Sequence, residues 1–308
     1  MPEGHLTHRL AAVMQHWFAG QNLTVSSPQG RFRAGAKHLN GRILEEAIAN
    51  GKHFFLRFGS EYLHVHLGIY GSWCLAGDEN YTGPPFIGAP RPTFAAAHPQ
   101  PESALDLFQA APGKLNERAL SNQPVPPDTA YKPDEPAPNV RLRLLTEHTV
   151  ADLSGPTACE VLDSEAYGAL KSRLGVDPLA PGDGTSAFIA AIRKRSRPIA
   201  VLLMEQSVAS GIGNVYRAEC LFRAGISPMR TIVSEVRLTA LWGEITVMLE
   251  RGYREGNMRT SEGEVIGGVA LKHYVYGRAG ELCVRCGGTV KMRMLAGRKL
   301  YWCPGCQH

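Results

Sequence analysis

The 308-residue sequence predicts an α+β protein built of three parts. Short runs of alternating apolar residues dominate the chain up to about residue 76, helical periodicity dominates after Leu153, and two Cys-x2-Cys pairs close the chain. We therefore expect an N-terminal β-sandwich domain over 1–150, a helical domain over 151–279 and a four-cysteine zinc finger over 280–308.

The composition is that of a folded protein with a reduced cysteine set. Hydrophobic residues make up 44% and charged residues 20%, which is enough apolar material for a sizeable core and excludes global disorder. Seven cysteines form no disulfide framework, no apolar run reaches the ~18 residues of a membrane span, and the N-terminus lacks a signal-peptide pattern. These features predict a soluble protein of the cytoplasm that does not engage a membrane.

The net charge of +5 is unevenly distributed. Basic residues cluster at 193–197 and again between Lys291 and Lys299, a pattern compatible with a polyanion-binding surface. From charge alone, ordinary solvated faces are the simpler interpretation.

The elements of the first half follow from periodicity and turn signals. Apolar residues at helical spacing predict a helix directly after the N-terminal dipeptide. Strands are expected over 54–56, 62–66, 72–75 and 140–144, with turns at Asn50-Gly51 and Gly59-Ser60. The segment 77–138 is rich in Pro, Ala and Gly and is interpreted as a long insertion with one short helix over 102–111.

The second half has the pattern of helices broken by Gly, Pro and Asp. We expect helices over 158–174, 186–194, 198–207, 215–224 and 234–253. Between the third and fourth of these, Gly211-x-Gly213-Asn214 predicts a turn whose backbone N–H groups form an anion site, with Asn214 either capping the helix or donating to a phosphate. A dinucleotide-binding turn is excluded, because Tyr216 stands where a third glycine would be needed.

The two cysteine pairs have the spacing of a metal site. Each pair can bind adjacent edges of one tetrahedral zinc ion while the sixteen residues between the pairs form a hairpin. Four thiolates close the coordination sphere, so the zinc would be structural. The expected ligands are Cys283, Cys286, Cys303 and Cys306. Arg298 lies near the expected hairpin tip, where its guanidinium could bind a phosphate or simply be solvated.

Chemistry is also predicted at the N-terminus. Removal of Met1 would leave Pro2 as a free secondary amine beside the carboxylic acid of Glu3. Such an amine is suited to attack on a carbonyl-like carbon. Taken alone, a proline at this position more often serves only to permit removal of the initiator methionine.

Together these motifs resemble the formamidopyrimidine-DNA glycosylase and endonuclease VIII family. The resemblance rests on Pro2-Glu3, the Gly211-to-Asn214 turn, Tyr274 to Arg278, and the cysteine pairs with Gly297-Arg298 between them, in the right order along nearly the whole chain. It implies a β-sandwich, a helix-two-turn-helix domain and a zinc finger. It also implies a bifunctional DNA glycosylase and abasic-site lyase of base excision repair.

The resemblance also implies roles for individual residues. Pro2 would be the nucleophile, forming a Schiff base that leads to β,δ-elimination, and Glu3 the general acid. Lys52, Asn214 and Arg298 match the family's phosphate contacts, and Lys52 and Arg298 thereby join the catalytic set. Glu219 matches the acidic residue of an Asn-x-Tyr-x-x-Glu pattern, with its role left open.

A further match lies at 66–71, the family's loop that fills the void left by an extruded base. Ile69 would fill the void, Tyr70 would stack on neighbouring bases, and His66 would contact the DNA backbone. Taken alone, Ile69 could equally be a buried residue at a strand end.

Two features point to the endonuclease VIII branch and hence to oxidised pyrimidines. Gly4 follows Pro2-Glu3, and no clear glycine-rich lesion-capping loop occurs over 255–273. In addition, Leu6 stands where many family members have a second glutamate, so a contact of that carboxylate with the lesion base is missing. The alternatives are the same chemistry on 8-oxoguanine and formamidopyrimidine lesions, or a non-catalytic zinc-ribbon binder of damaged DNA. We expect a monomer that binds damaged double-stranded DNA, with single-stranded DNA left open.

Overall fold

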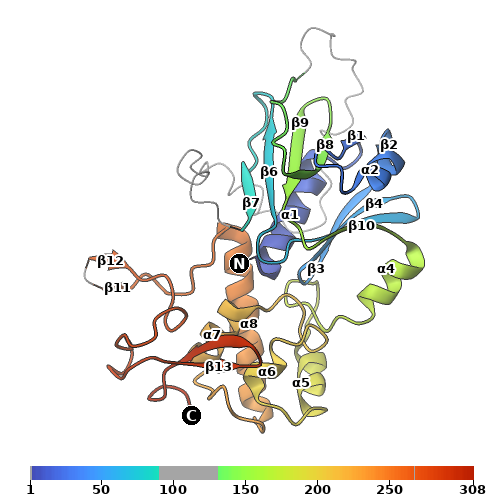
Figure 1. The fold of residues 1–308 in the computed structure, drawn as a ribbon. Coiled ribbons are helices and arrows are strands. Elements are labelled where there is room, and N and C mark those ends of the chain that lie inside the picture. The colour runs from blue at the N-terminus through green and yellow to red at the C-terminus, as the bar shows by residue number, and fades with distance from the viewer. Residues whose placement is uncertain (1, 90–130, 267) are drawn as a thin grey trace. The chain divides into compact units, whose positions relative to one another are not determined.

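The computed structural model describes residues 2–89, 131–266 and 268–308 (Figure 1). The chain divides into two compact units. The first, here called the sheet unit, comprises Met1–Pro2 and Leu6–Lys171, and the second, the helical unit, comprises Glu3–His5 and Ser172–His308. Most of the expected insertion, including the helix expected over 102–111, lies outside the described residues.

The sheet unit contains two antiparallel sheets. The six-stranded sheet has the order β2-β1-β8-β9-β6-β7 and the four-stranded sheet has the order β10-β5-β4-β3. The strands of the first are β1 Asn22–Ser26, β2 Arg42–Ile43, β6 Ser72–Gly77, β7 Phe86–Gly88, β8 Val140–Leu145 and β9 Thr149–Ser154. Those of the second are β3 Glu46–Asn50, β4 His53–Phe58, β5 Glu61–His66 and β10 Ala158–Asp163.

Two tight turns set the register of the four-stranded sheet. Asn50 pairs with His53 across a two-residue turn that begins at Gly51, whose φ is +58°. Phe58 pairs with Glu61 across the next turn, where Gly59 has a φ of +65°. Glycine adopts this left-handed conformation without the steric cost that a Cβ atom brings. Both turn predictions are confirmed.

The core of the sheet unit lies between the two sheets. Phe54 of β4 packs edge-to-face on Trp73 of β6, with ring centroids 6.1 Å apart. The helix α1, Gly4–Trp17, buries its apolar side chains, and Gln15 accepts a 2.8 Å hydrogen bond from the backbone N–H of Ala47 in β3. The described part of the unit also contains the helices α2, Arg33–Leu39, and α4, Ser164–Lys171.

The prediction of a helix over 158–174 is wrong for the first third of that range. Residues Ala158–Asp163 form β10, which pairs with β5 along its whole length, and the helix is confined to Ser164–Lys171. Cross-strand pairing on an open sheet edge outweighs a weak local helical pattern. Similarly, β7 lies inside the segment 77–138 that was expected to be an insertion, yet it forms a strand that pairs with β6.

The helical unit consists of four helices and two hairpins in its described part. The helices are α5 Thr185–Arg193, α6 Ile199–Leu202, α7 Asn214–Arg223 and α8 Glu235–Glu255, and the hairpin strands are β11 Val265–Ile266, β12 Val269–Ala270, β13 Lys291–Leu295 and β14 Arg298–Trp302. The helix expected over 198–207 is a single turn, because the chain turns again directly after Leu203. No helix among the residues that the structure describes is both long and apolar enough to cross a membrane.

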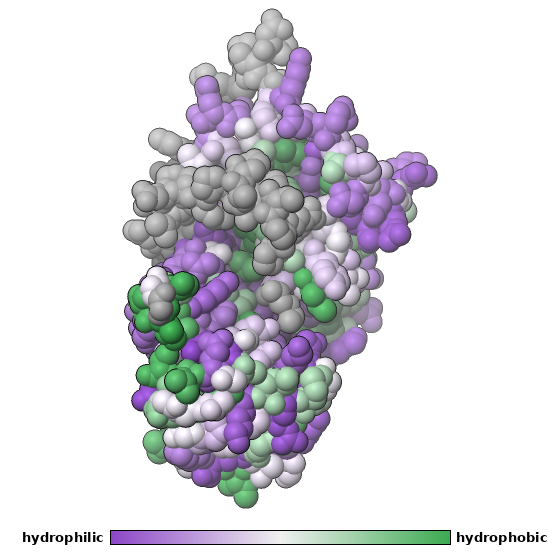
Figure 2. Space-filling model, turned by 60° about the vertical axis from the view of Figure 1, so that its left-hand side comes forward, coloured by the Kyte–Doolittle hydropathy of each residue, from purple (hydrophilic) through white to green (hydrophobic). Residues whose placement is uncertain are grey.

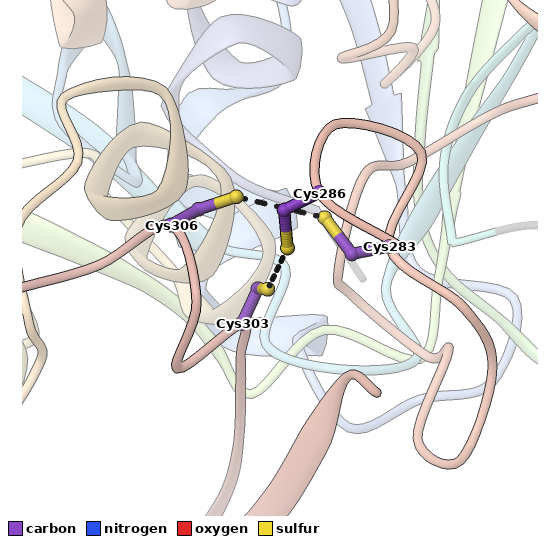
Figure 3. A group of neighbouring side chains, drawn as sticks. All are labelled: Cys283, Cys286, Cys303 and Cys306. Carbon is purple, nitrogen blue, oxygen red and sulfur yellow. Dashed lines mark hydrogen bonds between the residues drawn. The ribbon is translucent and has the colours of Figure 1, made fainter. Parts of the chain in front are cut away.

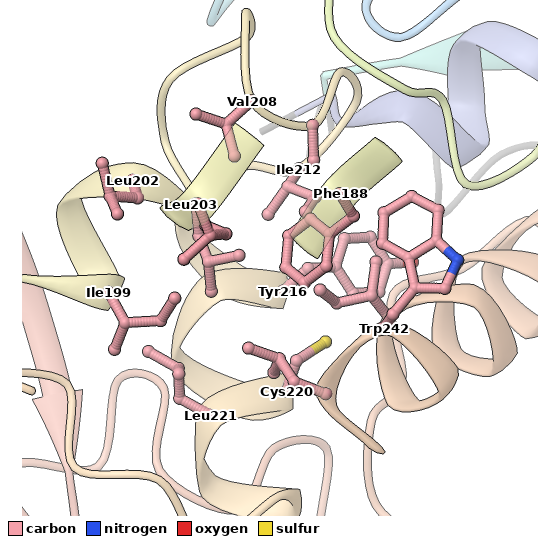
Figure 4. Packing of buried hydrophobic residues seen from close by; sticks show 14 of the residues in the cluster. Phe188, Ile199, Leu202, Leu203, Val208, Ile212, Tyr216, Cys220, Leu221 and Trp242 are labelled. Carbon is pink, nitrogen blue, oxygen red and sulfur yellow. The ribbon is translucent and has the colours of Figure 1, made fainter. Parts of the chain in front are cut away.

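The helices enclose one hydrophobic core (Figure 4). Phe188 of α5 stacks on Trp242 of α8 with centroids 4.9 Å apart, and Tyr216 of α7 lies in the same cluster. Leu300 of β14 is fully buried there too. The C-terminal hairpin is therefore fixed to α7 and its neighbours by apolar packing.

One hairpin of the helical unit carries its apolar side chains on the surface. Val265, Ile266 and Val269 of β11 and β12 are exposed, and Figure 2 shows a group of hydrophobic residues on its left-hand side at the height of this hairpin in Figure 1. The segment 255–273, where no clear glycine-rich loop was expected, thus contains a short β-hairpin.

Candidate active site and nucleic-acid contacts

The carboxylate of Glu3 lies at the N-terminus of α7. Its Oε2 accepts a 2.7 Å hydrogen bond from the backbone N–H of Gly213, and its Oε1 accepts a 3.0 Å bond from that of Val215. The side chain is fully buried. Unpaired N–H groups and the positive end of the helix dipole stabilise a negative charge at this position. The anion site predicted at this turn is therefore occupied by the protein's own carboxylate.

The glycines of this turn are explained by the N-terminal segment. A Cβ atom on Gly213 would lie 2.3 Å from Cδ of Glu3, and one on Gly4 would lie 2.8 Å from Cα of Gly211. Gly4 also donates a 2.9 Å backbone hydrogen bond to the carbonyl of Gly211. Only glycine leaves room for the Glu3 side chain at Gly213 and for the close approach of the two backbones at Gly4. The turn thus receives Glu3 and Gly4.

Pro2 is buried and lies two residues before Gly4, the first residue of α1. Because Glu3 follows it in the chain, the hydrogen bonds that fix Glu3 also restrain the position of Pro2. The nitrogen that removal of Met1 would free is thus attached to a segment held by backbone contacts.

Asn214 connects α7 to the C-terminal hairpin. It is the first residue of α7, its Nδ2 donates a 2.9 Å hydrogen bond to the carbonyl of Lys299 in β14, and its Oδ1 accepts one from Arg217. Asn214 therefore does not cap the helix. Its role toward DNA remains a prediction.

No sequence motif pointed to Arg217, which the structure places beside these residues. Arg217 is 1% exposed and its guanidinium also donates to the carbonyl of Lys299 at 3.1 Å, while its Nε has no hydrogen-bond partner in the described part of the chain. Burial and then the positive charge of Arg298 lower the pKa of Arg217 to about 10. Arg217 therefore links α7 to β14 by a hydrogen bond from its buried side chain within the helical unit.

The fully buried carboxylate of Glu219 binds the segment that leads into the zinc finger. It accepts backbone hydrogen bonds of 2.7–2.8 Å from Tyr274, Val275 and Tyr276, and a 2.6 Å bond from the hydroxyl of Thr260. The sequence pattern located this residue but not its task. Glu219 fixes the chain on both sides of the β11–β12 hairpin to α7.

Arg298 lies at the tip of the β13–β14 hairpin. It pairs with Leu295 across a two-residue turn in which Ala296 and Gly297 have φ angles of +49° and +74°. This is the geometry of a tight turn between twisted strands. The expected position of Arg298 is confirmed, and its side chain is exposed.

The four predicted cysteines form one cluster (Figure 3). All four sulfur atoms lie within 4.8 Å of one another, with Cys283 and Cys306 3.8 Å apart and Cys286 and Cys303 3.4 Å apart. A zinc tetrahedron with Zn–S bonds of about 2.3 Å has sulfurs about 3.8 Å apart. The donors therefore fit one structural zinc ion, and their arrangement would leave no ligand position for a substrate.

Two of the remaining predicted residues lie on the four-stranded sheet. Lys52 follows Gly51 in the β3–β4 turn, and His66 ends β5. His66 accepts a 3.1 Å hydrogen bond at Nδ1 from the backbone N–H of Gly68. Burial, followed by the charges of His64 and Lys52, lowers the pKa of His66. Lys52 and His66 are therefore close enough to interact electrostatically.

The loop 67–71 presents two large side chains to solvent. Gly71 donates a 2.8 Å backbone hydrogen bond to the carbonyl of Leu67, and Gly68 has a φ of +63°, so the loop is tight. Ile69 is 53% and Tyr70 78% exposed. The alternative of a buried Ile69 is wrong for this structure.

Three segments of the chain match described protein domains. Residues 1–106 match the formamidopyrimidine-DNA glycosylase N-terminal domain, 174–262 the formamidopyrimidine-DNA glycosylase H2TH domain, and 280–308 the zinc finger found in FPG and IleRS. "Endonuclease 8 1" of Mycobacterium tuberculosis H37Rv is 37% identical over 316 residues, covering 100% of both chains.

The chain belongs to the formamidopyrimidine-DNA glycosylase and endonuclease VIII family.

Two further relatives have lower sequence identity. "Endonuclease 8 2" of Mycobacterium bovis is 30% identical over 311 residues with full coverage of both chains. The formamidopyrimidine-DNA glycosylase of Thermus thermophilus is 31% identical over 186 residues, covering 56% of this chain and 70% of its own. Members of the family are DNA glycosylases with abasic-site lyase activity, and this chain is a DNA glycosylase of base excision repair.

Solved structures of the family share the fold. The Lactococcus lactis Fpg in complex with DNA containing an abasic site aligns with a TM-score of 0.67 at 20% identity, covering 99% of both chains. MutM in complex with DNA containing carbocyclic 8-oxo-G aligns with a TM-score of 0.68 at 21% identity over 100% of both chains. The expected architecture of a sheet domain, a helix-two-turn-helix domain and a four-cysteine zinc finger is confirmed.

Proposed function

We propose that this enzyme removes oxidised pyrimidines from double-stranded DNA and then cleaves the abasic strand by β,δ-elimination, acting as a monomer. Its nucleophile is the secondary amine of Pro2, which forms a Schiff base with C1′ of the deoxyribose. The observation that carries this proposal is the buried carboxylate of Glu3, held beside Pro2 in the chain by the N-terminus of α7.

The hydrogen bonds of Glu3 define its part in the reaction. Two backbone N–H donors favour the charged carboxylate, which takes the proton of the Pro2 ammonium and leaves a nucleophilic amine. The carboxylic acid so formed donates that proton to the ring oxygen of the sugar as the Pro2 nitrogen attacks C1′ and the bond from C1′ to the ring oxygen breaks. The Pro2 nitrogen then gives up its remaining proton to the departing base, and its lone pair expels that base from C1′. The iminium ion that results acidifies C2′ and permits elimination of the 3′ phosphate.

Three groups bind the phosphates around the lesion. Arg298 lies at an exposed hairpin tip, and Asn214 donates a hydrogen bond to Lys299 of that hairpin. Lys52 lies in the turn between β3 and β4. Cationic and amide donors of this kind position the DNA backbone without reading its sequence.

The exposed side chains of loop 67–71 replace the extruded base. Ile69 enters the void in the stack and Tyr70 lies against the neighbouring bases, with His66 contacting the backbone. Their exposure and the tightness of the loop support these roles, because an apolar wedge must be rigid and accessible before DNA arrives.

Two findings favour pyrimidine lesions over 8-oxoguanine. Full-length similarity of 37% is found with proteins named endonuclease 8, whereas the formamidopyrimidine-DNA glycosylase relative matches 56% of the chain. In addition, the close contact with Gly211 requires glycine at position 4. The residue typical of the endonuclease VIII branch is therefore part of the site that holds Glu3.

Borohydride trapping tests the proposal. The untagged protein is incubated with duplexes carrying thymine glycol, 8-oxoguanine or an abasic site, in parallel with Pro2→Gly and with a version extended at the N-terminus. We expect a covalent adduct that requires a free Pro2 and forms fastest on the thymine glycol duplex. Fastest trapping on 8-oxoguanine would instead assign purine lesions, and tight DNA binding without any adduct would identify a non-catalytic binder of damaged DNA.

A further inference from the structure

Three residues of the four-stranded sheet form a hydrogen-bonded chain that the proposed reaction does not use. Nδ1 of His53 lies 2.9 Å from Nε2 of His64, and Nδ1 of His64 lies 3.0 Å from Oε1 of Glu160. The three residues come from β4, β5 and β10, which are neighbours in the sheet. We call Glu160, His64 and His53 the histidine chain.

The direction of these hydrogen bonds follows from the carboxylate. Ionised Glu160 only accepts, so His64 donates from Nδ1 and, when neutral, keeps a lone pair on Nε2. His53 must then donate from its own Nδ1 to that lone pair. This leaves Nε2 of neutral His53 as a lone pair, and it has no hydrogen-bond partner among the residues that the structure describes.

Aromatic contacts hold both rings in place. Phe55 stacks on His64 with centroids 5.0 Å apart, and His53 stacks on His64 at 5.2 Å. His53 also meets the ring of His66 edge-on at 5.0 Å, across the strand pair that joins β4 and β5. His53 therefore has a defined orientation beside Lys52 and His66.

The groups around His53 keep it neutral in the free protein. Burial is the largest cause, and the charges of His66, His64 and Lys52 add to it, so that the pKa of His53 falls to about 3. His66 uses its Nδ1 lone pair to accept from Gly68 and so carries its proton on Nε2. Among the described residues, Glu160 is the carboxylate that faces the chain, and it favours charge on His64.

We propose that His53 is a further phosphate contact beside Lys52, and that His64 and Glu160 are positioning residues which orient its ring and offset its charge. The inference rests on the proposed DNA contact of Lys52. When a phosphodiester oxygen arrives, a proton from solvent adds to Nε2 of His53, and the resulting N–H donates to that oxygen. The positive charge on His53 then has a negative group on each side. The phosphate contacts it directly, and Glu160 is connected to it through His64.

This arrangement links binding to proton uptake. The phosphate raises the pKa of His53 in the complex above its value in the free protein, so between those two values the complex holds one more proton. Affinity therefore increases as the pH falls through this window, by up to about tenfold per pH unit. A neutral donor in place of His53 would bind phosphate without any such dependence.

Calorimetric titration with a duplex containing the tetrahydrofuran analogue of an abasic site measures the protons directly. This analogue cannot form a Schiff base, so binding is separated from chemistry. The zinc-loaded full-length protein is titrated at pH 6.0 in two buffers of different ionisation enthalpy. We expect proton uptake that His53→Asn abolishes, because asparagine retains a donor toward His64 but cannot be protonated. His38→Asn is the matched control, since His38 pairs with Glu61 outside the histidine chain.

Affinities across pH 5.5–8.5 complete the test. His53→Asn should weaken binding about tenfold at pH 6.0 and less than about twofold at pH 8.5. His53→Gln, which presents an amide donor near the position of Nε2, should bind with an affinity that no longer varies with pH in this window. Glu160→Gln should shift the uptake to lower pH, because the offsetting charge is gone.

Two outcomes separate this inference from the proposed function. Tight binding that depends on Lys52, with the same proton uptake in wild type and His53→Asn, would overturn the role of His53 alone. His53-dependent uptake in a protein that gives no borohydride adduct would overturn the catalytic proposal and leave the phosphate contact standing.

Discussion

Glu3 can reach the N-terminus of α7 because Gly213 has only a hydrogen atom as its side chain. The carboxylate lies in the space that any larger side chain would need, and the N–H of Gly213 is one of its two donors. Catalytic geometry is sensitive to displacements of about 1 Å, which can reduce a rate about 100-fold. Adding a single methyl group at Gly213 should therefore slow catalysis, although no reactive group is removed.

We predict that Gly213→Ala reduces the single-turnover rate of base excision by about 100-fold or more. The added methyl group displaces the Glu3 carboxylate, while Pro2 is chemically unchanged. Rapid-quench kinetics on a lesion duplex measures the effect. Gly243→Ala is the matched control, because a Cβ atom there meets nothing within 4 Å and lies in α8. A Gly213→Ala rate equal to that of the control would contradict the role of this contact.

At Glu219 one carboxylate satisfies four donors. We predict that Glu219→Gln lowers the free energy of unfolding by about 1–3 kcal/mol, because an amide NH2 would face backbone N–H groups and leave them unpaired. Denaturant unfolding measures this change. Glu250→Gln, at an exposed residue whose contact with Arg254 is 3.7 Å long, should change stability by less than about 0.5 kcal/mol.

Among the elements, the loop between β5 and β6 has an unusual distribution of polarity. Its backbone is closed by a hydrogen bond, yet its two largest side chains face solvent. Exposing apolar area that could be buried has no benefit for folding. A partner that provides the missing apolar surface would explain the arrangement, and we propose that the opened base stack is that partner.

We predict that Ile69→Ala and Tyr70→Ala each weaken binding to a lesion duplex by about tenfold, with little effect on undamaged DNA or on the melting temperature. Loss of a base-stacking side chain costs about 1–3 kcal/mol. Competition binding with matched damaged and undamaged duplexes measures the ratio. Ile232→Ala, at another strongly exposed isoleucine, is the control. An equal loss on both duplexes would show that the loop does not recognise the lesion.

The C-terminal hairpin is held by two hydrophobic clusters. Leu300 enters the helical core, while Cys283 and Cys303 are buried in a second cluster with Phe222 and Tyr274. Two of the four expected zinc ligands are therefore part of a hydrophobic cluster that includes residues of α7. Loss of the metal should affect the position of Arg298 as well as the finger itself.

Zinc removal should release the C-terminal segment. We predict that chelation abolishes amide protection over 280–308 and weakens DNA binding, because cysteines without a metal take up protons and no longer close the hairpin through bonds to a shared ion. Hydrogen exchange with mass spectrometry reports each segment separately, and protection in β4 and β5 should persist. Full protection of 280–308 after complete chelation would mean that packing alone holds the finger.

For the whole molecule, DNA binding should show the salt dependence of a small set of phosphate contacts. With the cationic Lys52 and Arg298 each neutralising one phosphate, log affinity should fall by about 1.8 per decade of salt, and Lys52→Met should reduce this slope by about 0.9. Lys37→Met, at an exposed lysine of α2, should leave the slope unchanged. An unchanged slope for Lys52→Met would remove Lys52 from the DNA contacts.

Much of the molecule was predictable because its signals are local. The turns at Gly51 and Gly59, the helices α7 and α8, the hairpin tip at Arg298 and the cysteine cluster all follow from residue types at short spacing. A turn glycine or a Cys-x2-Cys pair specifies its own geometry, whatever the rest of the chain does. The division into a sheet-rich first half and a helical second half followed from the same patterns.

The remaining features depend on contacts between residues far apart in the chain. Residues 158–163 became a strand because β5 had an edge to pair with, and the anion site before α7 was taken by a carboxylate 210 residues away. The tasks of Arg217 and Glu219, and the chain from Glu160 to His53, likewise required the fold. Burial and hydrogen bonding between distant segments have no local signature, so the sequence determined which elements and reactive groups exist, and only the tertiary structure decided what each one touches.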